Sequence, residues 1–196
     1  MNHKVEIRVA DDRDFEHTKT ISEWYVRSSK ERGTGIATRT AEYLKIKMEH
    51  GNSIIAFVDD QLAGFCYVEV FSSGDYVSNS GLIVSKDFRG RGLAKAIKGK
   101  AFNHARDTYP EAKVFGITTS DIVMGINSDL GYRPVTFSHL TDDEEFWKGC
   151  GSCKNYDILL RNEKKMCLCT AMLAPSKAST MKVDLEELII QPNEEK

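Results

Sequence analysis

The chain has 196 residues, of which 41% are hydrophobic and 29% charged, and its formal net charge is −2. This composition is typical of a soluble globular protein, and no apolar run approaches the ~20 residues that a membrane-spanning helix needs. The near-neutral charge argues against a nucleic-acid-binding protein, whose basic surface would be broader than one helix. The first residues contain no apolar run typical of an export signal, so we expect a cytoplasmic protein whose five cysteines are reduced.

Hydrophobic periodicity and turn residues predict alternating blocks of strands and helices along the first two thirds of the chain. The strands are expected at 5–10, 53–58, 62–71, 76–84, 113–119 and 133–139, and the helices at 15–29, 41–51, between the turn at 89–92 and Pro110, and at 121–130. Antiparallel hairpins come first and parallel crossovers follow. This order predicts an α+β (mixed α/β) fold and argues against a doubly wound one.

The strongest functional signal lies in residues 80–106. A short apolar strand is followed by the basic turn Arg89-Gly90-Arg91-Gly92 and by a helix whose apolar residues recur every three or four positions. The first amides of such a helix lack intrahelical partners and the macrodipole adds positive charge, so this turn can cradle an anion. Between Lys86 and Arg106 the chain has seven Lys or Arg residues and one acid. We therefore expect a phosphorylated ligand here; the alternative is a solvated basic helix.

Arg89-x-x-Gly92-x-Ala94 resembles the Arg/Gln-x-x-Gly-x-Gly/Ala motif of the GNAT superfamily of coenzyme A-dependent N-acyltransferases, and the order of elements over 5–137 is similar to that family's. The resemblance implies a mixed, mostly antiparallel sheet flanked by helices, with acetyl-CoA or another short acyl-CoA as co-substrate. It implies that the loop amides bind the pyrophosphate, and that the preceding strand separates from its neighbour and exposes its backbone to the pantetheine arm. The implied cofactor-binding residues are Ile83, Val84, Arg89, Gly90, Arg91, Gly92, Leu93 and Ala94.

A second stretch, 121–132, resembles a GNAT pattern in which a helix ends in Leu-Gly-aromatic. It departs from that pattern at Asp121, where the family commonly has a cofactor-binding Asn, and at Asn127, where many members have the Tyr that protonates the leaving thiolate. Asn127 is therefore a catalytic and cofactor-binding candidate whose amide could hydrogen-bond the sulfur. The alternatives are a thiolate that leaves without a dedicated acid, given a thiol pKa of ~8.5, or an ordinary amphipathic helix.

An amine nucleophile must be neutral, so a base has to take its proton directly or through water. Glu69, near the end of a strand expected to border the cleft, is the catalytic candidate; the alternative is a solvent-facing strand residue. Tyr67 and Asn79 are weaker candidates that could order a water. His139 lies past the usual position, and a lone histidine is more often structural.

In the GNAT fold the loop between the first two helices determines the acceptor, and here that loop, 31–40, contains Arg32 and Arg39. Guanidinium groups bind carboxylates in a bidentate manner, so a small dicarboxylic amino acid would suit them; the alternative is two surface arginines. The chain also resembles a bacterial GNAT subgroup linked to arginine biosynthesis (N-acetylglutamate synthase-like). That resemblance implies a small-molecule amine as acceptor, for example L-glutamate.

Two other functions stay open at this point. One is a protein or polyamine acetyltransferase, although a polyamine site would need acids in the loop at 31–40. The other is a catalytically silent acetyl-CoA-binding module that senses the cofactor or assembles with another protein.

Beyond a GNAT core at 1–140, we expect a cysteine-containing hairpin extension of the same domain at 141–173 and a tail at 174–196. The hairpin would pair 156–160 with 166–173. The spacing of Cys150, Cys153, Cys167 and Cys169 also permits a four-thiolate zinc site, but we favour no metal because the two cysteine pairs meet only if the chain folds back. The tail is either frayed or packs on a partner subunit, which would make a homodimer.

Overall fold

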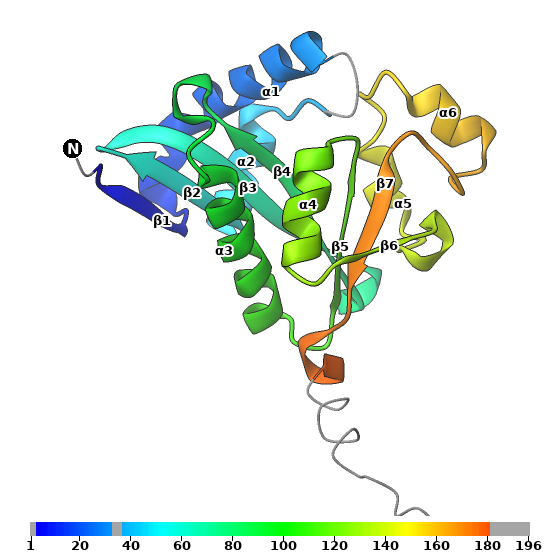
Figure 1. Cartoon of the computed structure of the whole chain (residues 1–196). Coiled ribbons are helices and arrows are strands. Elements are labelled where there is room, and N and C mark those ends of the chain that lie inside the picture. The colour runs from blue at the N-terminus through cyan, green and yellow to red at the C-terminus, as the bar shows by residue number, and fades with distance from the viewer. Residues whose placement is uncertain (1–2, 33–36, 181–196) are drawn as a thin grey trace, which may run out of the picture.

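A sheet forms the centre of the molecule and helices cover both of its faces (Figure 1). The computed structural model describes residues 3–32 and 37–180. In this part of the chain the sheet has seven strands in the order β1-β2-β3-β4-β5-β7-β6. They are β1 (Val5–Val9), β2 (Ser53–Val58), β3 (Gln61–Phe71), β4 (Tyr76–Val84), β5 (Lys113–Thr118), β6 (Arg133–Val135) and β7 (Thr170–Ala174). Every neighbouring pair is antiparallel except β4 and β5, so the predicted mixed, mostly antiparallel sheet is confirmed.

Helices pack on both faces of the sheet. The helices are α1 (Thr18–Arg32), α2 (Ala41–Glu49), α3 (Leu93–Thr108), α4 (Asp121–Asp129), α5 (Glu144–Lys148) and α6 (Tyr156–Arg161). Side chains of α1 and α2 share one apolar cluster with β2, β3 and β4, whereas those of α3 and α4 share another with the opposite face of the same strands. Because side chains alternate along a strand, one stretch of β3 supplies both clusters. No helix of the described residues is long and apolar enough to span a bilayer.

Turn and cap residues explain why several boundaries fall where the sequence predicts them. Asp11 accepts from the amide of Arg13 in a capping box that starts the first helical segment, and Thr40 caps α2. Asp59 and Asp60 both have positive φ, as a tight hairpin between β2 and β3 requires. These local devices fix the positions of α2 and β3, which carry side chains of the site.

A third apolar cluster joins α5 and α6 to the sheet. The ring centroid of Phe146 on α5 lies 4.8 Å from that of Phe115 on β5 and 5.5 Å from that of Phe71 on β3. Trp147 donates its indole N–H to the carbonyl of Thr141 at 3.0 Å. This cluster holds the connection between α5 and α6 beside the sheet.

The predicted hairpin of 156–160 with 166–173 is wrong. Residues 156–160 lie in α6, where Leu159 is buried in the third cluster, and β7 pairs with β5 and β6 instead. A five-residue apolar run does not by itself separate a buried strand from a short helix. The strand predicted at 133–139 is also too long, because β6 ends at Val135 and a 3-10 turn follows. Residues 33–36 of the predicted acceptor loop, and the segment 183–190 of the tail, lie outside the described residues.

Candidate active site

The loop before α3 has the geometry of an anion cradle. Gly90 and Gly92 both have φ of 77°, and Gly92 is the N-cap of α3. A Cβ atom at either glycine would meet no heavy atom within 4 Å, so the space in front of the loop is open. Arg89 donates from Nε to the carbonyl of Val84 at 3.1 Å and ties the loop to the end of β4. Open space, unpaired helix-start amides and the macrodipole together suit the pyrophosphate of coenzyme A.

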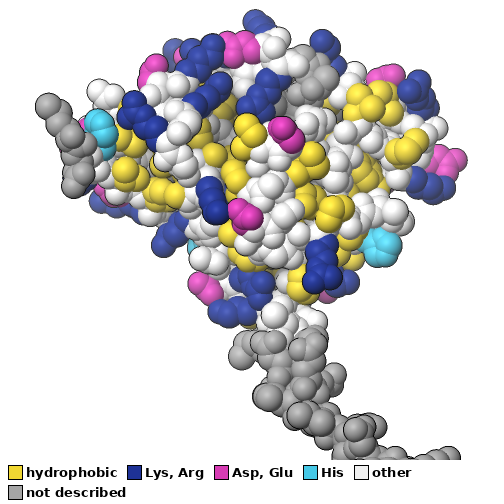
Figure 2. Space-filling view, viewed as in Figure 1, with side chains coloured by type: hydrophobic (Ala, Val, Ile, Leu, Met, Phe, Trp, Pro, Cys, Tyr) yellow, Lys and Arg dark blue, Asp and Glu magenta, His cyan; other side chains and the backbone are white. Residues whose placement is uncertain are grey.

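Basic side chains surround this loop. Lys86, Arg89 and Arg91 are exposed, and Figure 2 shows Lys and Arg side chains along the rim of the face where the loop before α3 lies. Lys86 pairs with Glu31 at 2.5 Å, and Lys95 on α3 pairs with Asp129 at 2.8 Å. The remaining positive charge is available to a phosphorylated ligand.

Beside the cradle, β4 separates from β5, as the resemblance implied. The two strands pair only where Tyr76–Ser78 faces Lys113–Phe115, although β4 continues to Val84 against β3 (Figure 1). The backbone of 79–84 therefore has a free edge on the side of β5. Ile83 and Val84 lie at this edge, with their side chains buried and their backbone beside the gap.

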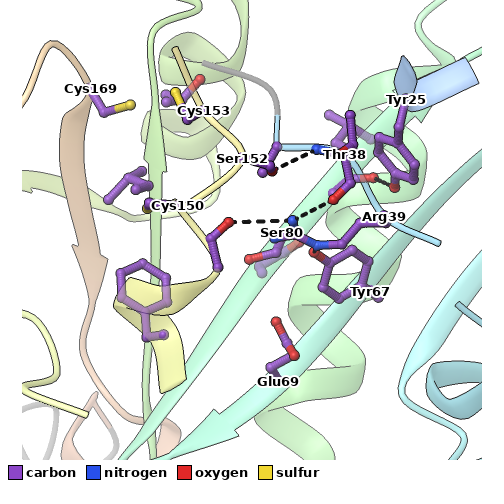
Figure 3. A pocket seen from close by; sticks show the side chains of 18 of the residues that line it. Tyr25, Thr38, Arg39, Tyr67, Glu69, Ser80, Cys150, Ser152, Cys153 and Cys169 are labelled. Carbon is purple, nitrogen blue, oxygen red and sulfur yellow. Dashed lines mark hydrogen bonds between the residues drawn. The ribbon is translucent and has the colours of Figure 1, made fainter. Parts of the chain in front are cut away.

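A pocket of about 660 Å³ begins at this gap. It is lined by 79–82 of β4, by 117–120 after the strands separate, by 37–40 before α2, and by 149–153 between α5 and α6 (Figure 3). The pocket therefore connects the free edge of β4 with side chains on the α1–α2 face of the sheet.

Arg39 is the main cation on the α1–α2 side of the pocket. Its Nε donates to the hydroxyl of Tyr67 at 2.7 Å, and its Nη1 donates to the carbonyls of Thr38 and Gly149 at 2.9 and 3.4 Å (Figure 3). Its Nη2 has no hydrogen bond, and no carboxylate lies within 4 Å of the guanidinium, among the described residues. This group can bind the carboxylate of a ligand.

The tyrosines around Arg39 hold it in place and stay neutral. Burial raises the pKa of Tyr67 to about 12, against the opposing effect of Arg39. Burial alone would lower the pKa of the Arg39 guanidinium, but Tyr67 and Tyr43 raise it above its usual value. The ring of Tyr43 lies 5.3 Å from the guanidinium carbon, a cation–π distance. A permanently charged group is thus fixed at the pocket wall.

Glu69 lies on the same face of β3 as Tyr67 and also lines the pocket. It is half-buried rather than solvent-facing. Its Oε1 accepts from the hydroxyl of Tyr43 at 2.5 Å and pairs with Nζ of Lys47 at 2.6 Å. Its Oε2 makes no hydrogen bond to the described residues. The carboxylate is therefore oriented by two neighbours and has one oxygen to offer to a substrate or a water.

Three other predicted residues lie in different surroundings. Asn127 is not part of the pocket wall: it is 1% exposed, and its amide nitrogen donates to the sulfur of Met172 at 3.4 Å. α4 directs this side chain into the sheet core, so the structure does not bring it to a thiolate leaving group. Arg32 lines the pocket from the exposed end of α1. His139 is exposed in a 3-10 turn and bonds Thr136.

Cys150, Cys153 and Cys169 line the pocket. Within the described residues no group of three or more His, Cys, Asp or Glu side chains is arranged to hold a metal ion. Burial raises the pKa of Cys150 to about 11 and that of Cys169 to about 12, with neighbouring cysteines adding to the effect. The thiols of Cys150 and Cys169 are therefore protonated near neutral pH and form a weakly polar part of the wall.

The sequence missed two features of the pocket. The connection 149–153 reaches Arg39 only because α5 packs on Phe115, a contact across more than thirty residues of chain. Lys98, which the sequence places on a basic helix, is 3% exposed and donates from Nζ to the carbonyl of Asn79 at 3.0 Å. The carbonyl of Asn79 is available to Lys98 because β4 and β5 separate at this residue, and the periodicity of the helix could not indicate this contact. Tyr67 and Glu69 share a face because residues two apart along a strand point to the same side.

Comparison with known proteins agrees with this geometry. Residues 20–120 match the family model described as the acetyltransferase (GNAT) family. No curated protein sequence matches the chain. The fold is similar to N-acetylglutamate synthase from Neisseria gonorrhoeae complexed with coenzyme A and N-acetyl-glutamate, with a TM-score of 0.62 and 17% identity over 90% of this chain and 36% of that one. The present chain thus spans about a third of that synthase.

Two shorter enzymes are matched over nearly their whole length. Phosphinothricin acetyltransferase from Sinorhizobium meliloti, in complex with acetyl-CoA, gives a TM-score of 0.59 at 15% identity over 99% of this chain and 95% of that one. The PaiA N-acetyltransferase from Thermoplasma acidophilum, in complex with coenzyme A, gives 0.54 at 13% identity over 88% and 99%. At these identities the likeness concerns the fold alone.

Proposed function

The chain belongs to the acetyltransferase (GNAT) family, and we propose that it transfers an acyl group from a short acyl-CoA to the amine of a small amino acid that carries a carboxylate. L-Glutamate is the acceptor to test first, in a reaction of amino-acid biosynthesis. The observation that supports this choice is Arg39, a fixed guanidinium without an acidic partner among the described residues, in the pocket at the free edge of β4.

The donor half of the reaction rests on backbone groups. The loop amides at 90–94 and the start of α3 would bind the pyrophosphate, and the free edge of β4 at 79–84 would orient the acyl thioester, which supplies an activated carbonyl. Unpaired N–H groups on this edge would stabilise charge that develops on the carbonyl oxygen.

The acceptor half rests on side chains. Arg39 would bind the acceptor's carboxylate and thereby place its amine beside Glu69 and the gap between β4 and β5. Glu69 would take the proton that the amine loses, directly or through a water, as its nitrogen bonds to the acyl carbon and the carbon–sulfur bond breaks. Because Asn127 is buried, the departing thiolate would take its proton from water.

The extension at 141–173 would belong to the same domain as the core, because its residues 149–153 contribute to the pocket and bond the segment before α2. Gly149 accepts from Arg39, and the hydroxyl of Ser152 accepts from the amide of Thr38 at 3.2 Å. An acceptor site at this place would have both segments in its wall.

A catalytically silent acyl-CoA sensor is the second candidate. Two observations favour it: Glu69 is engaged by Lys47 and Tyr43, and Asn127 does not reach the pocket. A protein or polyamine acetyltransferase is less well supported, because the cation at the pocket wall would repel a polyamine.

A thiol-release assay with acetyl-CoA and succinyl-CoA against the standard amino acids and a set of polyamines separates these functions. We expect turnover confined to glutamate or aspartate. Turnover with polyamines alone would support the polyamine enzyme. Thermal stabilisation by acetyl-CoA without turnover on any amine would support the sensor.

A further inference from the structure

Lys98 is a buried cation that the reaction described above does not use. It is 3% exposed, and its Nζ donates to one protein group, the carbonyl of Asn79, at 3.0 Å. No acidic side chain of residues 3–32 or 37–180 lies within 4 Å of it. It nevertheless lines the same pocket as Arg39 and Glu69. A buried ammonium without a counterion is costly, and burial lowers the pKa of Lys98 for this reason. An anionic ligand would favour the charged form and complete this site.

Lys98 lies at the closed end of the gap between β4 and β5. The free edge of β4 runs from Val84, beside the cradle, to Asn79, and pairing with β5 begins at the next residue, Ser78. Five residues of strand span about 17 Å. A ligand whose pyrophosphate binds at the cradle and whose chain follows this edge therefore points its far end toward the Nζ of Lys98.

The surroundings of Lys98 are polar on the α3 face of the sheet. Asn79 pairs in register with Val68, which faces α3, and its side-chain oxygen accepts from the thiol of Cys66 at 3.1 Å. The amide nitrogen of Asn79 donates to the backbone carbonyl of Lys98 at 3.4 Å. Asn79, Ser80 and Lys98 all line the pocket here, so this end of the gap suits a polar ligand better than a methyl group.

Arg39 and Lys98, two of the basic side chains that line the pocket, lie on opposite sides of the sheet. Arg39 contacts Tyr67, which packs with α1 and α2, whereas Lys98 belongs to α3. The cradle is on the α3 side as well. Arg39 is therefore placed for the acceptor, and Lys98 is placed for the acyl donor.

We propose that Lys98 forms an acyl-chain subsite that binds the terminal carboxylate of a dicarboxylic acyl-CoA, of which succinyl-CoA is the probe. The proposal rests on the acyltransferase function and names its donor class. The bond changes are those of any acyl transfer: the amine nitrogen bonds to the thioester carbon, the carbon–sulfur bond breaks, and the far carboxylate stays bound and unreacted. The product is an N-acyl amino acid with one more carboxylate than an acetyl donor would give.

The contrasting interpretation is a structural lysine that only holds Asn79 where the strands separate. Butyryl-CoA distinguishes the two, because its acyl chain has the same number of carbons as succinyl-CoA but no carboxylate. If Lys98 is only structural, substituting it should change the affinity for both donors alike. If it binds the carboxylate, the substitution should weaken the binding of succinyl-CoA alone.

The test is calorimetric titration of the full chain, without acceptor, with coenzyme A, butyryl-CoA and succinyl-CoA. Wild type is expected to bind succinyl-CoA about 10- to 100-fold more tightly than butyryl-CoA, the range for a hydrogen bond to a charged group. In Lys98→Met this preference should vanish while binding of coenzyme A is unchanged. Lys100→Met, an exposed lysine on the same helix, should keep it.

Equal affinity of wild type for succinyl-CoA and butyryl-CoA would overturn the proposed subsite. This comparison needs no variant, so it remains a valid test even if Lys98→Met fails to fold. Equal weakening of both donors by Lys98→Met would also overturn it. If coenzyme A binds, either result leaves the acyltransferase function intact. Failure of coenzyme A itself to bind wild type would instead overturn the proposed function and the subsite with it.

Discussion

The two halves of the pocket differ in the groups that form them: backbone groups in one and side chains in the other. On the α3 side, one continuous segment, 79–94, provides a free strand edge, two glycines with positive φ and a helix start. On the α1–α2 side, side chains from three distant segments meet: Arg39, Tyr67 with Glu69, and the connection 149–153. The first half recognises its ligand mainly through backbone groups, and the second through side-chain charge. Single substitutions should therefore abolish donor binding only at glycines, yet change acceptor specificity readily.

The largest effect is expected from Gly92→Val. A side chain here would project into the open space that the pyrophosphate needs, so binding of coenzyme A should be lost in titration calorimetry. The positive φ adds about 1–2 kcal/mol of strain, which would show as a lower free energy of unfolding. Gly51→Val is the matched control, because Gly51 has φ of 64° and no heavy atom within 4 Å of its Cβ position, but lies away from the cradle. Normal binding by Gly92→Val would place the donor site elsewhere.

Glu69→Gln should lower kcat about 100-fold or more, the usual contribution of a general base. The KM for acyl-CoA should stay unchanged, since the donor half does not involve this side chain. The amide keeps the shape of the carboxylate and can still accept from Tyr43, but it loses the charge that pairs with Lys47, so the free energy of unfolding should fall modestly. Steady-state kinetics measures both parameters, and a kcat within about threefold of wild type would remove Glu69 from the mechanism.

Arg39→Gln should raise the KM for a carboxylate-bearing acceptor about 10- to 100-fold, because a charge-assisted hydrogen bond is lost. Arg39→Lys keeps the charge but not the planar fork that bonds Tyr67, so it should recover only part of the loss. Affinity for coenzyme A should be the same in both variants. An unchanged KM in Arg39→Gln would show that the acceptor carboxylate binds elsewhere.

The smallest effect concerns thiol reactivity at the pocket wall. The thiolate is the reactive form, and the pKa values of Cys150 and Cys169 are raised to about 11 and about 12. Their alkylation by iodoacetamide should therefore be slow near neutral pH and rise steadily as the pH approaches those values. Peptide mass spectrometry over a pH series follows each cysteine separately. Full modification of Cys150 within minutes near pH 7 would contradict its protonated state.

The same contrast explains what the sequence could predict. The cradle is local: an apolar strand, a glycine turn and a periodic helix follow one another, so the residues themselves indicate an anion site at Arg89 and Gly92. The separation of the strands was implied only by the resemblance to the GNAT family. The helical structure of residues 156–160 could not be predicted from the local sequence, because a short apolar run fits either a strand or a helix. Their conformation depends on packing in the cluster that contains Phe115 and Phe146. The burial of Asn127 and Lys98 also depends on distant partners, Met172 and Asn79, that no spacing rule connects to them.

The most direct test of the account is the product of the reaction. Wild type and Arg39→Gln, each incubated with acetyl-CoA or succinyl-CoA and L-glutamate, are compared by mass spectrometry for N-acylated glutamate and by thiol release. The account predicts N-acylglutamate from wild type, formed in step with free coenzyme A, and a strong reduction in Arg39→Gln at low glutamate concentration. Absence of any acylated amino acid from wild type that still binds coenzyme A would contradict it.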